Sequence, residues 1–253
     1  EQGPGQNEIG FKFSDALSTA DHMLTFKSVV KEIAARNGLF ASFMPKPLLN
    51  KSGSGLHVNL SLTQNGFNIF KSSMQEQTDT AKSFLAGILE KVPEITMFLN
   101  PIFNSYERFG SFEAPKYISW SHQNRSQLVR IPAAVGERMR MELRSPDPAI
   151  NPYLAFALIM ASGLYGIESK LALPDSVDVD LFVENESITK HLRTLPGSLE
   201  EAIELAESST LVKEVIGEEL LQKIVSIKRE ETAAFAEAED KTLFYRERYF
   251  NIV

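Results

Sequence analysis

Charged and apolar residues alternate strictly between Arg138 and Arg144, where the sequence reads Arg-Met-Arg-Met-Glu-Leu-Arg. As a β-strand, this stretch places its three arginines and Glu142 on one face and directs the methionines and the leucine into an apolar core. Like charges at this spacing repel one another unless anions or metal ions lie among them. The pattern indicates a site for a phosphate-bearing substrate. For the stretch taken alone, the alternative is a solvated strand held by surface salt bridges.

A second alternating stretch spans residues 53–62 and begins with a flexible Gly-Ser-Gly turn. Its aliphatic residues predict a core side, whereas His57, Asn59 and Ser61 predict a side of ligand donors. A single histidine is more often a structural residue than a ligand. The polar neighbours and the preceding glycines nevertheless make His57 a good candidate ligand.

Two more stretches predict strands that would complete a sheet around a polar cavity. Residues 124–132 are rich in β-formers and carry Arg125 and Arg130. A regular strand would send these two arginines to opposite faces unless a bulge or bend intervenes. Residues 5–13 alternate isoleucine and phenylalanine with Glu8 and a lysine. Several strands with apolar backs and charged fronts favour one sheet that lines a polar site.

The chain resembles glutamine synthetase along essentially its whole length. The ordered motifs that carry the resemblance lie at residues 1–8, 53–57, 104–115, 124–126, 130–132, 142–148 and 151–154. The Leu-Pro-Gly-Ser-Leu motif at residues 195–199 and the helical C-terminus are similar to the bacterial type I branch. The resemblance does not cover the beginning of that family's chain. Residues 1–253 are therefore expected to form one catalytic domain, incomplete at its N-terminal side and without a second domain.

Helical patterns separate these strands. They predict helices over residues 19–36, over 80–91 with an end before Pro93, over 153–167 as a buried helix capped by Asn151, from Ser198 onward, and over about 218–248. No low-complexity linker divides the chain, so one α+β domain is preferred. The resemblance implies a curved, mainly antiparallel sheet that lines the site, with helices packed against it.

Composition excludes several classes of function. The 253 residues are 43% hydrophobic and carry a net charge of −7, and without a basic run this balance argues against a nucleic-acid partner. The chain has no cysteine, which leaves oxygen and imidazole ligands suited to Mg²⁺ or Mn²⁺. No signal peptide or membrane span is evident, so a cytoplasmic protein is expected.

The residue types suit one demanding reaction. Joining an amine to an unactivated carboxylate requires a better leaving group, and ATP can supply one as an acyl phosphate. Such chemistry needs divalent ions across the phosphates, cationic clamps on the transferring phosphoryl group, and a carboxylate that deprotonates the amine. The sequence offers each of these types.

The resemblance assigns roles to individual residues. It implies metal ligands at Glu1, Glu8, His57 and Glu142, glutamate or ammonium contacts at Glu1, Gly53, Arg108 and Arg144, nucleotide contacts at Phe13, Ser61, Arg130 and Arg140, and catalytic groups at Glu113, Arg125 and Arg130. In this match, Glu113 is the carboxylate of a mobile flap, and the catalytic arginines are phosphate clamps. The chain departs from many members at Ser52, where they have asparagine, and at Asn59, where they have a second histidine.

The resemblance implies ATP-dependent ligation of ammonia to the γ-carboxylate of glutamate through γ-glutamyl phosphate, giving glutamine, ADP and phosphate. It also implies a homo-oligomer, a stacked-ring dodecamer in the complete family member. Two alternatives remain: a γ-glutamyl amine or polyamine ligase, and a non-catalytic fragment or paralogue. In the family, the upstream part contributes a metal-binding glutamate to each of two ion sites. This chain alone is therefore expected to be inactive.

Overall fold

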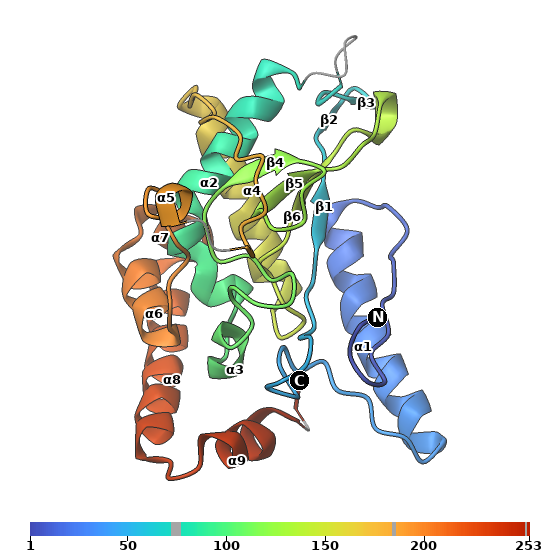
Figure 1. The fold of residues 1–253 in the computed structure, drawn as a ribbon, viewed down its shortest axis with the longest axis vertical. Coiled ribbons are helices and arrows are strands. Elements are labelled where there is room, and N and C mark those ends of the chain that lie inside the picture. Colours follow the sequence, from blue (N-terminus) through green and yellow to red (C-terminus); the bar gives the residue numbers. More distant parts are fainter. Residues whose placement is uncertain (72–76, 184–185, 251) are drawn as a thin grey trace.

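A four-stranded sheet forms the centre of the computed structural model, which describes residues 1–71, 77–183, 186–250 and 252–253. Its strands lie in the order β1 (Val58–Leu60), β6 (Met141–Leu143), β5 (Val129–Ile131) and β4 (Trp120–His122) (Figure 1). The β1–β6 and β6–β5 pairs are antiparallel, and the β5–β4 pair is parallel. A small hairpin of β2 (Thr63–Gln64) and β3 (Phe67–Asn68) follows β1. The predicted α+β class with a mainly antiparallel sheet is confirmed.

Strand register brings one polar residue from each strand into a row. Glu142 pairs with Asn59 on one side and with Arg130 on the other, and Arg130 pairs with Ser121. Paired residues on neighbouring strands point to the same face of a sheet. The next row is apolar, because Leu143 pairs with both Val58 and Val129. The sheet therefore presents a polar row to one side and an apolar row to the core.

All four predicted strands differ from the structure. The strands predicted over 53–62 and 124–132 are shortened to β1 and β5. The strand expected over 138–144 is shorter, because Gly136 turns the chain at a φ of 61° and Arg138 belongs to the 3₁₀ helix η1 (Gly136–Arg138). The prediction of a strand over residues 5–13 is wrong. These residues form no ladder with β1 or with any other described strand, and Phe13 is 81% exposed. Alternation specifies the two faces of an extended segment, but a strand also needs a partner edge.

Helices pack on the sheet and beside it (Figure 1). In chain order they are α1 (Ala16–Arg36), α2 (Asp79–Leu99), α3 (Phe103–Tyr106), α4 (Pro152–Glu168), α5 (Glu186–Thr189), α6 (Leu199–Ser208), α7 (Thr210–Ile216), α8 (Glu218–Glu237), α9 (Lys241–Tyr245) and the π-helix η2 (Arg246–Phe250). Among the described residues, none of these helices has the length and apolar character needed to cross a membrane.

Most of the predicted helices are present, with corrections at their ends. Asn151 caps α4 as predicted, but α4 is buried on one side only and exposes Met160 and Leu164 on the other. The helix predicted over 218–248 is interrupted after Glu237, because Asp240 accepts hydrogen bonds from backbone N–H groups and starts α9. Local capping thus ends a run of helix-forming composition.

Close packing of α2 against α4 fixes the helical layer that supports the sheet. A Cβ atom on Gly87 would lie 2.6 Å from the backbone nitrogen of Gly166, and a Cβ atom on Gly166 would lie equally close to Gly87. Only glycine at both positions permits this approach of the two backbones. The contact brings α4 next to α2, whose buried side chains share one apolar core with the strands.

Helix α2 continues through Pro93, so the predicted end before this proline is wrong. Proline lacks the N–H group that would bond to the carbonyl of Leu89 one turn earlier. The Arg193 guanidinium donates to this carbonyl at 3.0 Å and also pairs with Glu90 at 3.1 Å. A side chain from a distant segment thus satisfies the acceptor that proline leaves open, and burial of residues such as Val92 and Ile95 stabilises the helix across the break.

This capping contact predicts a specific double-mutant result. Replacing Arg193 by methionine should lower the free energy of unfolding by about 1 kcal/mol, because a buried carbonyl loses its donor. In a Pro93→Ala background the same replacement should cost clearly less, since the introduced alanine supplies its own backbone N–H to the carbonyl of Leu89. Denaturant unfolding of the four variants measures both costs, and Glu90→Gln isolates the exposed ion pair. Equal costs in the two backgrounds would contradict the capping role.

An aromatic cluster joins the C-terminal segment to the rest of the structure. Phe235 stacks on Phe103 with ring centroids 4.1 Å apart and on Tyr245 at 5.5 Å. The hydroxyl of Tyr249 donates to the buried carboxylate of Glu231. Burial and this carboxylate raise the pKa of Tyr249 well above its ordinary value. The cluster thus keeps the Tyr249 phenol protonated in the folded protein.

We therefore expect the protein to lose stability in alkaline solution. Above about pH 10 an unfolded tyrosine releases its proton while the folded Tyr249 keeps it, so the free energy of unfolding falls as pH rises, by up to about 1.4 kcal/mol per pH unit for one group. Tyr249→Phe should reduce this slope between pH 9.5 and 11, measured by denaturant unfolding. The partly exposed Tyr165 of α4 supplies the control Tyr165→Phe. An unchanged slope in Tyr249→Phe would refute the assignment.

Candidate active site

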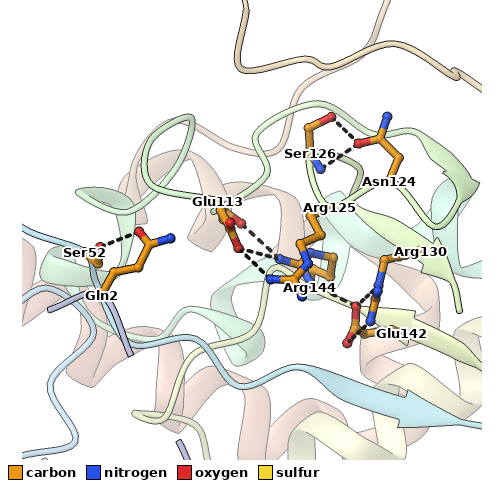
Figure 2. A network of polar contacts seen from close by, with 9 residues as sticks. All are labelled: Gln2, Ser52, Glu113, Asn124, Arg125, Ser126, Arg130, Glu142 and Arg144. Carbon is orange, nitrogen blue, oxygen red and sulfur yellow. Dashed lines mark hydrogen bonds and ion pairs between the residues drawn. The ribbon is translucent and has the colours of Figure 1, made fainter. Parts of the chain in front are cut away.

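Five charged residues of alternating sign form a continuous network at the edge of the polar row (Figure 2). Arg130 Nε lies 2.6 Å from Glu142, and Arg144 Nη1 lies 2.9 Å from the same carboxylate. Arg144 also approaches the Glu113 carboxylate at 3.9 Å, and Arg125 approaches it at 3.6 Å. The structure thus brings together the three residues predicted to be catalytic and two predicted to hold metal or substrate.

Glu142 is the buried centre of this network. It is 5% exposed and its neighbour Arg144 is 2% exposed, so both charges are largely removed from water. Burial opposes ionisation of Glu142, but hydrogen bonds from Arg130 and Arg144 outweigh it and lower the pKa of this carboxyl group to about 2. A carboxylate at this depth remains charged because two guanidinium groups hold it.

Arg125 reaches the network from a turn and not from a strand. The turn follows β4 and is closed by Asn124, whose side-chain oxygen accepts from the backbone N–H of Ser126 at 3.0 Å and from its hydroxyl at 2.8 Å (Figure 2). Arg125 therefore lies outside β5, and Arg125 and Arg130 do not share one regular strand as the pattern over 124–132 predicted. The turn leaves the Arg125 side chain 66% exposed, beside the sheet and close to Glu113.

The loop that carries Glu113 has an unusual backbone. Both Phe112 and Glu113 have positive φ values, 47° and 67°, in the left-handed region that non-glycine residues rarely adopt. Arg144 contacts Glu113 twice, because its guanidinium also donates to the backbone carbonyl of Glu113 at 3.4 Å. Backbone strain of this kind occurs where surrounding contacts hold a loop in one arrangement.

A second, fully buried cation lies next to Gly53. Arg108 donates to the backbone carbonyl of Ser145 at 3.0 Å and lies 4.0 Å from Asp147. A Cβ atom on Gly53 would lie 2.5 Å from the Pro45 carbonyl and 2.9 Å from Arg108. Glycine is therefore required for the turn to approach this arginine.

His57 and three carboxyl groups, those of Glu1, Glu8 and Glu142, supply candidate donors for divalent ions. Loss of hydration and the positive charge of Arg144 lower the pKa of His57 to about 4, against the attraction of Glu142, so the imidazole is neutral and able to ligate. The Glu8 carboxyl group lies within hydrogen-bonding reach of Glu1, and this contact, together with loss of hydration, raises the pKa of Glu8.

Oxygen and imidazole donors fit Mg²⁺ or Mn²⁺. The donors occur in two pairs, one of Glu1 with Glu8 and one of His57 with Glu142. Within the part of the chain that the structure describes, no group of three or more His, Cys, Asp or Glu residues is arranged to hold a metal ion. Each pair therefore supplies part of a ligand set.

Two of the four predicted nucleotide contacts, Ser61 and Arg140, lie farther along the sheet than Arg130, which belongs to the charged network. Arg140 donates to the side-chain oxygen of Asn59 at 2.9 Å, and the next residues beyond the paired ends of β1 and β6 are Ser61 and Arg140. Phe13 is on the exposed N-terminal segment, and the described contacts do not join it to Arg140. Arg140 also donates to the backbone carbonyl of Arg138 at 3.2 Å. Asn59, identified in the sequence as a departure from many family members, thus accepts a hydrogen bond from Arg140 alongside Arg138.

Two charged residues at the site were missed by sequence reasoning. Lys46 and Asp147 are both buried, and Asp147 supports Arg108, while Lys46 contacts the loop of Glu113. Each stands between two prolines, in Pro-Lys-Pro and Pro-Asp-Pro. Prolines on both sides restrict the backbone, so a charged residue so placed is a signal that could have identified both positions.

Comparison with known proteins assigns the family. A sequence model described as "Glutamine synthetase, catalytic domain" matches residues 1–246. The chain belongs to this family. A glutamine synthetase of Methanosarcina mazei is 45% identical over 236 residues, which cover 91% of this chain and 53% of that protein. One from Clostridium saccharobutylicum is 43% identical, with the same coverage of each chain.

Solved structures confirm the glutamine synthetase catalytic-domain fold. A structure described as "GmaS/ADP complex-Conformation 1" superimposes with a TM-score of 0.83 at 34% identity, covering 94% of this chain and 55% of the other. A structure described as "Apo GmaS without ligand" gives a TM-score of 0.81 at 35% identity, covering 93% and 54%. The chain spans about half the length of the relatives that it matches.

The buried network predicts unequal effects of its arginines on stability. Arg144→Met should lower the free energy of unfolding by about 3 kcal/mol, because it leaves the buried Glu142 carboxylate with one cation. Arg125→Met should change it by less than about 0.5 kcal/mol, because the Arg125 side chain is largely exposed. Denaturant unfolding at neutral pH compares the two variants. An equal loss in the free energy of unfolding in both variants would show that the buried pairs with Glu142 do not stabilise the fold more than the exposed pair of Arg125.

Proposed function

We propose that the protein to which this chain belongs is a glutamine synthetase that ligates ammonia to the γ-carboxylate of glutamate through γ-glutamyl phosphate. The observation that carries the proposal is the network around Glu142, in which guanidinium groups converge beside candidate metal donors. The family consists of ligases that use ATP and divalent metal ions. Cations arranged in this way suit the charge that develops during phosphoryl transfer.

Each side chain then has a distinct task. Arg125 and Arg130 would clamp the transferring phosphoryl group, and Arg144 with Arg108 would hold the glutamate substrate beside Gly53. Glu113 would close over the site and accept a proton from the bound ammonium. Glu1 borders this ammonium position and would add to its negative field. Phe13, Ser61 and Arg140 would contact the nucleotide, and Asn59 would orient Arg140.

A divalent ion, Mg²⁺ or Mn²⁺, would bind at each of two donor pairs. Glu1 and Glu8 would hold one, and His57 with Glu142 would hold the other. When bound, the ions neutralise phosphate charge and polarise the phosphoryl group. Because each pair is only part of a ligand set, residues 1–253 alone should show little or no synthetase activity and should bind these ions weakly.

Further proposals concern the whole protein. The resemblance of residues 195–199 supports the bacterial type I branch, and the family supports a cytoplasmic homo-oligomer built as stacked rings. One apolar core that extends from Met23 to Val253 supports a single domain. The runner-up function is a γ-glutamyl amine or polyamine ligase, in which a larger amine takes the place of ammonia. A non-catalytic paralogue is disfavoured by the retained charged network.

The deciding experiment measures phosphate release from ATP by the complete protein in the presence of glutamate and ammonia. Glu142→Ala should abolish phosphoryl transfer, and excess Mn²⁺ should restore part of it. Arg144→Ala should weaken the use of glutamate by about 2 to 4 kcal/mol while calorimetry shows nearly unchanged nucleotide binding. Circular dichroism confirms that both variants are folded.

The outcomes separate the candidate functions. Release that depends on a larger amine and not on ammonia would favour the amine ligase. Nucleotide binding without release would favour the non-catalytic paralogue. If both variants fold and keep the parent's ATP and glutamate parameters, the charged row is a structural salt-bridge ladder, and the proposed site is wrong.

A further inference from the structure

A buried lysine lies between the Gly53 turn and the loop that carries Glu113. Lys46 is 2% exposed, and its ammonium nitrogen lies 4.3 Å from the centroid of the Phe112 ring. Its backbone N–H donates to the side-chain oxygen of Asn104 at 2.6 Å, and its carbonyl accepts from the same side chain at 3.0 Å. Asn104 is fully buried at the start of α3. Lys46 therefore extends from a firmly held backbone.

Among the described residues, none forms an ion pair with the Lys46 ammonium. Across residues 1–71, 77–183, 186–250 and 252–253, no carboxylate lies within the 4.0 Å that defines an ion pair with it. Burial and the neighbouring charge of Arg108 lower the pKa of Lys46, against the attraction of Glu107. The face of the Phe112 ring is the contact that favours a cation here, and such contacts strengthen when water is excluded.

The loop that carries Phe112 and Glu113 needs contacts from outside the loop to hold its backbone conformation. Phe112 and Glu113 are consecutive non-glycine residues in the left-handed region, and each such residue costs roughly 1 kcal/mol or more. Phe112 is 52% exposed, so core packing does not hold it. The turn is closed by two backbone hydrogen bonds, from Gly110 to Ala114 at 2.9 Å and from Ala114 to Ser111 at 3.0 Å.

We propose that Lys46 is a positioning residue that latches the Phe112–Glu113 turn and thereby places the Glu113 carboxylate between Arg125 and Arg144. The latch acts at Phe112, and the adjacent Glu113 receives its orientation through the shared turn. The effect of this latch on catalysis rests on the proposed function, in which Glu113 takes a proton from ammonium. The latch itself is a property of the loop and is measurable without any activity.

Hydrogen–deuterium exchange of peptides that contain Gly110 and Ala114 tests the latch in the complete protein. Lys46→Met, which keeps the length of the side chain but removes its charge, should speed exchange in this turn by about 2- to 30-fold, the factor that corresponds to a cation–π contact. Lys46→Arg should retain slow exchange. Phe112→Leu should match Lys46→Met, and the double variant should show no further increase.

A control variant removes a similar contact outside the C-terminal aromatic cluster. Lys91 of α2 lies over the ring of Tyr165 of α4, 4.8 Å from its centroid. Lys91→Met should leave exchange at Gly110 and Ala114 unchanged. If Lys46→Met does not fold, Phe112→Leu alone tests the latch. This variant should fold, because the Phe112 side chain is half-exposed.

Kinetics connect the latch to the site. Lys46→Met should lower kcat/KM for ammonia by a factor similar to its effect on loop exchange, with the KM for ATP unchanged. Unchanged exchange in both Lys46→Met and Phe112→Leu would overturn the latch. Faster exchange with unchanged ammonia kinetics would overturn its positioning role. A parent protein without ligase activity would instead count against the proposed function, and the exchange data would still decide the latch.

Discussion

Burial of the Glu142 carboxylate is the constraint on which the site depends. A charge removed from water is tolerated only when its partners meet it with good geometry. Arg130 pairs with Glu142 across two antiparallel strands, and Arg144 follows Glu142 by two residues, just past the end of β6. A slip of one residue in the β5–β6 register would turn Arg130 away and leave the carboxylate with one cation. The ion pairs thus specify register as well as electrostatics.

Cations outnumber carboxylates within the charged network. Arg125, Arg130 and Arg144 share the carboxylates of Glu113 and Glu142. The buried Arg108 has its own carboxylate partner, Asp147, at 4.0 Å. Folding alone does not favour an excess of positive charge, because like charges that are partly shielded from solvent repel one another strongly. Anionic ligands such as glutamate and a phosphoryl group would relieve it.

Sequence patterns anticipated the parts of the structure that local chemistry determines. Alternation predicted which sides of β1 and β6 face the core, and Asn151 predicted the start of α4, because both signals lie within a few residues. Two of the errors occurred where a distant segment decides the outcome. Residues 5–13 alternate like a strand without a partner edge, and α2 passes Pro93 because Arg193, far along the chain, caps the open carbonyl. Asp147 and Lys46 were missed because their importance comes from burial.

The short strands leave much of the positioning to loops, and these loops are held by segments distant in sequence. The segment that leads to Lys46 is tied to the chain's last residues, since Phe43 donates to the carbonyl of Val253 at 3.1 Å and Phe40 stacks on Phe250 at 4.7 Å. Asn104 then fixes Lys46 from α3, which also contacts the C-terminal aromatic cluster through Phe103. A loss of order in that cluster would therefore reach the Glu113 loop through Lys46, without any change in the sheet.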